Sequence, residues 1–269
     1  MVLNISRWVC CDLQEAMGQV ELRSEQGIRC IMDPLGELTK DEGASIGSLA
    51  NYLELIRAMD NRDMHTSISI KPTALGAAYD PERCSDKICE ITNQAWGKGI
   101  AVEIDMEARK YLDLTMGVVK QLGSLNRGSI SVAVQAYLYR TPKDILDLAS
   151  GGVGIRLVKG TYSGDIGDPG EVRGVMLENV DLLHSLGRPF SVGTHDPIII
   201  GKVTKDRSMK GLLEIGMLKG LGDDTKLRLA GRGWAVAEYV PFGSDSYSYT
   251  MRRENYLRQL LELGLEPCP

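Results

Sequence analysis

Short apolar runs typical of buried strands alternate with stretches of helical periodicity along almost the whole chain. The first run, 27–33, ends at Pro34, and apolar residues at helical spacing follow over 41–62. The alternation repeats without a linker or a low-complexity tract. We expect the later strands at 66–71, 99–105, 129–137, 152–159, 190–195, 210–217 and 234–240. The helices that follow them are expected at 81–96, 108–123, 142–150, 169–186, 197–207, 221–230 and 247–263.

Eight β-then-α units predict a parallel sheet, and this number favours a closed (β/α)8 barrel. The length of 269 residues suits one such barrel, which typically takes about 250. We interpret residues 1–25 as a short helical lead-in and 26–269 as the barrel. The alternative is an open Rossmann-type sheet. It lacks its GxGxxG fingerprint, because the glycines at 151, 152 and 154 precede a strand rather than open a helix.

Charge and cysteine usage exclude several classes of function. The net charge is −5, from 31 basic and 36 acidic residues without a basic run, which argues against a nucleic-acid partner. Apolar stretches stay well below the roughly 18 residues of a membrane helix, and no signal-peptide pattern opens the chain, so we expect a cytoplasmic protein. The six cysteines show no CxxC spacing and the three histidines are scattered, which predicts free thiols and no metal site.

Polar side chains end the apolar runs in seven of the eight predicted units. In barrels of this kind the active site is built from the carboxyl ends of the strands. Each such group needs a partner, because burying it alone costs about 1–3 kcal/mol. Lys71 and Asp105 could form an ion pair that closes the barrel mouth; together, however, the groups predict a net basic pocket for an anionic ligand. The residues are Asp33, Lys71, Asp105, Gln135, Arg156, Lys159, Thr194, His195 and Tyr239.

A second basic feature lies in the last predicted helix. Tyr249, Arg252 and Arg253 have the i, i+3, i+4 spacing that places them on one helical face. Alone, the Arg pair could be a solvated basic face. Two adjacent guanidiniums otherwise call for an anion between them, and their forks suit a carboxylate or phosphate. With the cations at the strand ends, two ligands are expected: one with phosphates or a polarisable ring, and one with a carboxylate.

These motifs, in this order, resemble the proline dehydrogenase family of flavin-dependent (β/α)8 barrels. The resemblance runs from about Gly27 to Arg253 and implies a monofunctional FAD enzyme. The reaction it implies is oxidation of L-proline to Δ1-pyrroline-5-carboxylate by hydride transfer from C5 to flavin N5. The matching segments are Asp33-Pro-Leu-Gly-Glu, Ser67-Ile-Ser-Ile-Lys71, Glu103-Ile-Asp105-Met-Glu, Val134-Gln-Ala-Tyr-Leu-Tyr139, Arg156-Leu-Val-Lys-Gly-Thr-Tyr162, Gly193-Thr-His195, Tyr239-Val-Pro-Phe-Gly243 and Tyr249-x-x-Arg252-Arg253.

The resemblance implies a substrate site for L-proline. Arg252 and Arg253 would hold the proline carboxylate, and Lys71 would complete this ionic clamp. Tyr239 and Tyr249 would pack on the pyrrolidine ring, and Tyr239 would crowd out a ring hydroxyl.

The resemblance also implies a flavin site. Arg156 would approach the flavin N5 edge, with Asp105 orienting it. Gln135 would bond the polar edge of the ring, and Met106 would contribute backbone. The path of the ribityl, pyrophosphate and adenine groups would be lined by Lys159, Gly160, Thr161, Thr194 and His195.

Electrons would pass to a quinone, which implies transient contact with a membrane surface, peripherally at its inner face. Δ1-pyrroline-5-carboxylate dehydrogenase would be the next enzyme. The chain departs from the family pattern at Pro72, where Leu is usual, at Thr161, where Ala is usual, and at Glu254, which directly follows the Arg pair. These departures keep open a flavin barrel acting on a different cyclic or N-alkylated amino acid, and a flavin-binding protein without activity. A Schiff-base aldolase using Lys71 or Lys159 is a third alternative.

Overall fold

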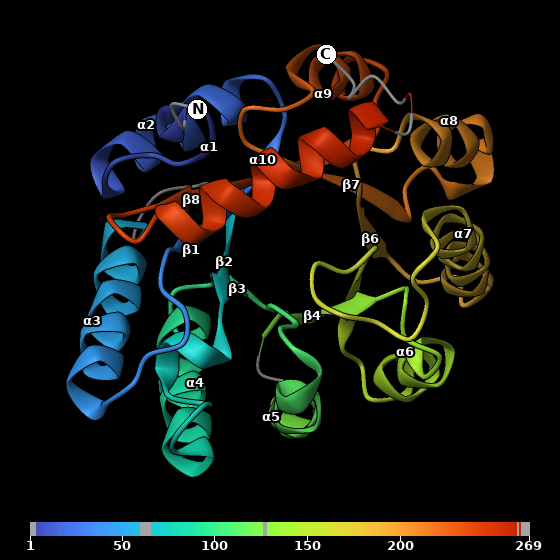
Figure 1. The fold of residues 1–269 in the computed structure, drawn as a ribbon. Helices are drawn as coiled ribbons and strands as arrows, with labels where there is room; N and C mark the ends of the chain where they lie inside the picture. Colours follow the sequence, from blue (N-terminus) through green and yellow to red (C-terminus); the bar gives the residue numbers. More distant parts are fainter. Residues whose placement is uncertain (1–3, 60–65, 126–127, 263, 265–269) are drawn as a thin grey trace. The chain divides into compact units, whose positions relative to one another are not determined.

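The computed structural model describes residues 4–59, 66–125, 128–262 and 264. Its eight strands form a closed parallel barrel in chain order, which confirms the predicted (β/α)8 fold (Figure 1). The strands are β1 (Arg29–Pro34), β2 (Thr66–Ile70), β3 (Ala101–Ile104), β4 (Ile130–Gln135), β5 (Gly154–Val158), β6 (Phe190–Gly193), β7 (Leu213–Leu218) and β8 (Ala235–Phe242).

A helix follows every strand, and two helices precede β1. Pro81 begins its helix with Asp80 as N-cap, whose carboxylate accepts from the Arg83 N–H, as expected. Residues 60–62 and Leu263, which were predicted as helix ends, and Cys268, which was predicted as a free thiol, lie outside the described residues. The helices are α1 (Ile5–Trp8), α2 (Leu13–Glu25), α3 (Glu42–Met59), α4 (Pro81–Trp96), α5 (Leu112–Leu125), α6 (Thr141–Ser150), α7 (Pro169–Ser185), α8 (Pro197–Lys205), α9 (Asp223–Gly231) and α10 (Tyr247–Glu262). Three 3₁₀ turns join them: η1 (Pro72–Leu75), η2 (Arg109–Tyr111) and η3 (Arg207–Met209).

The observed strands differ from the predicted ones by one to three residues at their ends, and two of these differences have a clear physical reason. β7 begins at Leu213 rather than at residue 210, because Leu212 N–H donates to Met209 O and continues the turn of η3. β8 runs past Pro241 to Phe242. Proline lacks an N–H, but the Pro241 carbonyl still accepts from Cys10 N at 2.9 Å, so the strand is not interrupted.

The chain divides into two compact units. The terminal unit comprises residues up to Leu35, Thr66 and the residues from Ser191 onward. In it β1 and β7 flank β8 in parallel, with Arg29 opposite Ala237 and Leu218 opposite Tyr239. The middle unit comprises Gly36 to Phe190 apart from the stretch before Ser67, and in it β2 to β5 pair in parallel.

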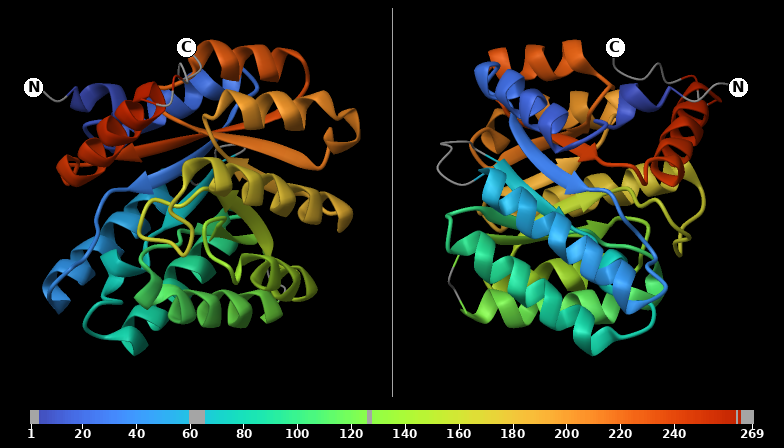
Figure 2. Two further views of the ribbon diagram at one scale, coloured as in Figure 1. Left: turned by 45° about the vertical axis from the view of Figure 1, so that its right-hand side comes forward. Right: turned by 90° about the vertical axis from the view of Figure 1, so that its left-hand side faces the viewer.

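In the terminal unit α2 and α9 both lie against β8 (Figure 2), and a buried ionic network joins the three elements. Glu238 on β8 is fully buried, and its Oε2 lies 2.8 Å from Arg23 Nη2 and also pairs with Lys226. Asp223 bridges the same two cations at 2.8 Å each. Because both cations are themselves buried, their pairing with Glu238 is needed to keep the charges compensated.

The described cysteines, Cys10, Cys11, Cys30, Cys84 and Cys89, are all free thiols, as predicted. No group of three or more metal-ligating side chains occurs in the described part of the chain. Among the described helices none has the length and hydropathy of a membrane span.

Candidate functional site

Four charged side chains form an ionic group in the middle unit: the buried Lys71, Glu103 and Arg156, and the partly buried Asp105. Lys71 Nζ donates to Asp105 Oδ2 at 2.8 Å, and the Arg156 guanidinium donates to Asp105 Oδ1. Arg156 Nε lies 3.3 Å from Glu103 Oε2. Asp105 therefore holds both cations, and the ion pair considered for Lys71 and Asp105 is confirmed.

Strand geometry explains how these charges meet. Glu103 stands two residues before Asp105, so the period-two alternation of a strand directs both to one face. Its Oε1 accepts from Ser67 Oγ on β2 at 2.6 Å. Arg156 lies in the middle of β5, not at its end, and its long side chain spans the remaining distance to Asp105. The sequence reasoning missed Glu103, although its i, i+2 spacing from Asp105 is the signal that identifies it.

The turn after β2 fixes the backbone of Lys71. Pro72 begins η1 directly after Lys71, so the strand exit continues into a 3₁₀ turn. The Thr73 N–H and Oγ1 donate to the two carboxylate oxygens of Glu107, at 2.7 and 2.5 Å. The pKa of Glu107 is raised to about 7, because the effect of burial is larger than the opposite effect of these two hydrogen bonds. Glu107 thus anchors the turn that carries Lys71.

The backbone after Asp105 is held by Gln135. Its Nε2 donates to the carbonyls of Met106 and Glu107, at 3.3 and 3.2 Å. Gln135 is buried at the end of β4. Both N–H groups of the Gln135 amide therefore bond to backbone carbonyls, and the amide oxygen is the atom that can accept a hydrogen bond from a ligand.

The loop after β5 wraps around the ring of Tyr137. Tyr162 N–H donates to Tyr137 Oη at 3.0 Å. A Cβ on Gly160 would lie 1.8 Å from Tyr137 Cε1, and one on Gly164 would lie 2.2 Å from Cδ2. Gly160 also has φ +116°, which a side chain disfavours. This loop, which contains Lys159, Gly160 and Thr161, can therefore approach the aromatic ring only because two of its residues are glycines.

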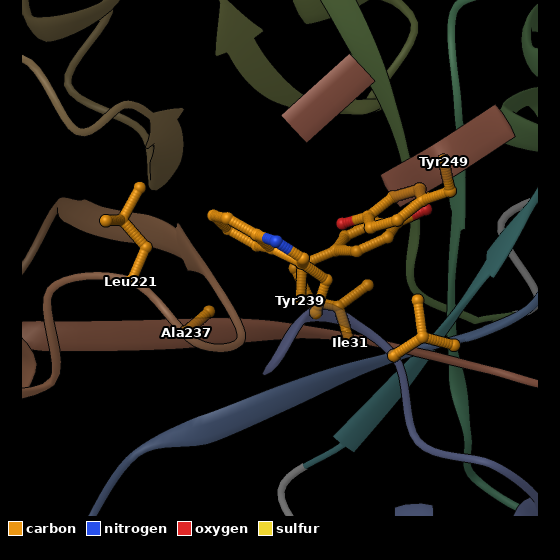
Figure 3. Close-up of a cluster of buried hydrophobic side chains, with 7 residues drawn as sticks. Ile31, Leu221, Ala237, Tyr239 and Tyr249 are labelled. Atoms are coloured by element: carbon orange, nitrogen blue, oxygen red, sulfur yellow. The ribbon is translucent and has the colours of Figure 1, made fainter. Parts of the chain in front are cut away.

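Aromatic side chains gather in the terminal unit. Tyr239 from β8 and Tyr249 from α10 belong to one buried cluster (Figure 3). Arg253 Cζ lies 4.7 Å from the centroid of the Tyr249 ring, a cation–π contact across one helical turn. Arg253 Nε is buried and has no hydrogen-bond partner within the described residues. Arg252 and Arg253 are half-buried, so neither is a fully solvated side chain.

His195 is a buried, neutral imidazole. Its Nε2 accepts from Leu218 N–H at 3.0 Å, which leaves the proton on Nδ1. Burial, with the nearby charges of Lys226 and Arg253, lowers the pKa of His195 to about 3. Thr194 Oγ1 accepts from Asp196 N–H at 3.1 Å, so its hydroxyl proton is directed elsewhere. Both side chains are therefore neutral hydrogen-bond donors.

Two further residues of the terminal unit were missed from the sequence. Lys219 directly follows β7, the one strand without an assigned polar end, and its Nζ donates to Ser6 O at 2.8 Å. Trp8 Nε1 donates to Glu254 Oε1 at 2.8 Å, which gives the atypical Glu254 a partner. The position of Lys219 directly after an apolar run is a signal that could have identified it. No signal in the sequence around Trp8 indicates its contact with Glu254.

Each unit, taken by itself, offers polar groups of the kind that hold a flavin. In the middle unit Arg156 and Lys159 supply cations and Gln135 an amide oxygen. In the terminal unit Thr194 and His195 supply neutral donors of the kind that bond phosphate or ribityl oxygens.

Comparison with known proteins decides the family. The family model described as Proline dehydrogenase matches residues 16–165, which is more than half of the 269 residues. The chain belongs to the proline dehydrogenase family. It is therefore an oxidoreductase of the proline dehydrogenase class.

Relatives named as proline dehydrogenases match most of the chain, and a solved structure shares its fold. The chain is 28% identical over 252 residues to Proline dehydrogenase 2 of Bacillus subtilis, covering 90% of this chain and 82% of the relative. It is 28% identical over 258 residues to the Proline dehydrogenase of Deinococcus radiodurans, with the same coverages. Proline utilization A from Bdellovibrio bacteriovorus, solved after inactivation by N-propargylglycine, superposes with a TM-score of 0.79 at 20% identity. That match covers 93% of this chain but only 32% of the solved protein, so the chain spans about a third of its length.

Proposed function

We propose that the chain oxidises L-proline to Δ1-pyrroline-5-carboxylate with FAD, which when bound would supply N5 as the acceptor of the C5 hydride and a route for the electrons to a quinone. The observation that carries the proposal is the arrangement on α10. A half-buried Arg pair lies beside a buried tyrosine, and Arg253 Nε has no hydrogen-bond partner within the described residues. A buried guanidinium nitrogen without a partner calls for an anionic ligand.

Arg252 and Arg253 bind the proline carboxylate in this proposal. A guanidinium presents parallel N–H donors that match two carboxylate oxygens, and the pair fixes the orientation of the amino acid. Tyr239 and Tyr249 give the pyrrolidine ring an apolar surface, which is supported by their burial in one cluster. The assignment of Lys71 to the same carboxylate stays a prediction, since in the middle unit Lys71 pairs with Asp105.

The flavin is assigned to the remaining polar residues. Arg156, oriented by Asp105, supplies a positive charge toward the N5 edge of the ring. Gln135 offers its amide oxygen to the ring, and Met106 its backbone. The ribityl, pyrophosphate and adenine groups are assigned to Lys159, Gly160, Thr161, Thr194 and His195. The fixed charges of Asp105 and Arg156 are in place before the reaction, which is the condition for electrostatic catalysis.

The partners follow from this chemistry. A quinone acceptor implies a transient, peripheral contact with the inner face of a membrane by a cytoplasmic protein. The product is the substrate of Δ1-pyrroline-5-carboxylate dehydrogenase. The division into a lead-in of residues 1–25 and a barrel of residues 26–269 stays a prediction.

The two alternative chemistries fare differently. A Schiff-base aldolase needs a lysine nitrogen that is free to attack a carbonyl, whereas Lys71 Nζ donates to Asp105 Oδ2 at 2.8 Å. Membership of the proline dehydrogenase family also sets that alternative aside. The alternative of a different cyclic amino acid as substrate is tested by measuring turnover of a panel of imino acids with a dye acceptor. The proposal expects the highest kcat/KM for proline.

The substrate assignment is tested by Arg252→Met and Arg253→Met. Each variant should raise the KM for proline by roughly tenfold or more, since an Arg–carboxylate contact is lost, while the flavin content stays that of the wild type. Arg258→Met is the matched control, because Arg258 is an exposed residue of the same helix. A wild-type KM in either Arg252→Met or Arg253→Met would show that the carboxylate binds elsewhere.

A further inference from the structure

The short helix α1 is fastened to the loop after β7. Arg7 Nε donates to Gly220 O at 2.8 Å, and Lys219 Nζ donates to Ser6 O and Arg7 O at 2.8 and 3.3 Å. Lys219 thereby satisfies carbonyls at the carboxyl end of α1. A helix of four residues has little stability of its own, so these contacts hold it in place.

Gly220 shows that the loop is shaped to receive α1. Its φ is +74°, and a Cβ built on it would lie 2.1 Å from Arg7 O and 2.8 Å from Arg7 Cγ. Any other residue at position 220 would displace α1. The position of α1 is therefore fixed both by its hydrogen bonds to the loop and by the glycine in the loop that makes room for it.

This docking buries Trp8 against the proposed substrate residues. Trp8 has no exposed surface and belongs to the cluster that contains Tyr239 and Tyr249. Its indole Nε1 donates to Glu254 Oε1 at 2.8 Å. Glu254 directly follows Arg253 on α10, and Arg253 stacks on Tyr249. One residue of α1 thus contacts both the cluster and the helix that carries the Arg pair.

We propose that Trp8 is a positioning residue for α10, acting through its hydrogen bond to Glu254. The proposal rests on the assignment of proline to the Arg pair. A hydrogen bond to a carboxylate is among the stronger kinds, and it fixes the rotation of α10 about its axis. Because Tyr249, Arg253 and Glu254 share two turns of one helix, a rotation at Glu254 moves all three together.

The test compares Trp8→Phe with Trp96→Phe in the FAD-loaded enzyme. Trp8→Phe keeps an aromatic ring but removes the indole N–H, and it should raise the KM for proline by about tenfold with kcat and flavin content nearly unchanged. Trp96 also donates its indole N–H, to Ser129 O at 3.1 Å in the middle unit, so Trp96→Phe should leave KM unchanged.

Variants of Glu254 keep the proposal testable if Trp8→Phe does not fold. Glu254→Leu removes the acceptor and should raise KM as Trp8→Phe does, whereas Glu254→Gln keeps an acceptor oxygen and should restore most of the affinity. The double variant Trp8→Phe/Glu254→Leu should be no worse than either single one, since both break the same bond.

The outcomes separate this inference from the proposed function. If Glu254→Leu and Trp8→Phe lower only the temperature of unfolding and leave KM unchanged, Trp8 is structural and the inference is wrong. If Arg252→Met leaves KM unchanged as well, the substrate assignment itself has failed. A raised KM in Arg252→Met with a normal KM in both other variants overturns this inference alone.

Discussion

The buried imidazole of His195 predicts a specific loss of stability in acid. The unfolded chain takes up a proton at the ordinary pKa of 6.5, whereas the folded chain holds the pKa of His195 at about 3. The folded pKa is the lower one, so the stabilisation is present above pH 6.5 and is lost as pH falls. Each pH unit below 6.5 costs about 1.4 kcal/mol, which gives about 2 kcal/mol between neutral pH and about pH 5.

Urea denaturation of the wild type and His195→Gln measures this loss. The glutamine amide oxygen can accept from Leu218 N–H, as Nε2 does, but it does not titrate. Between about pH 7.5 and pH 5 the wild type should lose about 2 kcal/mol more of its free energy of unfolding than the variant. Since the other titrating groups are common to both proteins, their contributions cancel. Parallel pH profiles would refute the reasoning, because they would mean that folded His195 accepts the proton freely.

Three further predictions follow from the packing. Glu238→Ala should lower the free energy of unfolding by about 3–5 kcal/mol, because it removes the buried carboxylate and leaves two buried cations with only the partly exposed Asp223. Glu214→Ala, whose partner Arg29 is partly exposed, should cost about 1 kcal/mol or less in the same urea titration. Gly160→Ala should lower the flavin content of the purified protein, since its Cβ would overlap the Tyr137 ring, whereas Gly167→Ala in the same loop meets nothing within 4 Å and should not. Hydroxyproline should show a lower kcat/KM than proline, because the proposed packing of Tyr239 on the pyrrolidine ring would crowd out a ring hydroxyl.

Local patterns predicted the fold well because each β-then-α unit carries its own signals. The Asp80-Pro81 pair, for example, marks the start of α4 through a side-chain cap and a preset φ, and both act within four residues. Pro241 misled the same approach. A proline usually ends a strand, but the carbonyl of Pro241 is paired by Cys10, which lies far away in the sequence.

The candidate site was predictable only where its residues lie on strand ends or one helical face. Asp105 and Lys71 met these criteria, and their ion pair is present. Trp8 and Glu254 are separated by 246 residues, so no periodicity or spacing connects them. Glu254 looked like a departure that weakened the site, and the structure gives it a hydrogen-bond donor from the opposite end of the chain.

The visible absorption spectrum of the purified, FAD-reconstituted protein, recorded without oxygen before and after addition of L-proline, tests the central proposal most directly. The proposal predicts a bound-flavin spectrum that bleaches on adding proline, because the two electrons from C5 reduce the ring. A protein that stays colourless after reconstitution, or a flavin spectrum that proline leaves unchanged, would contradict it.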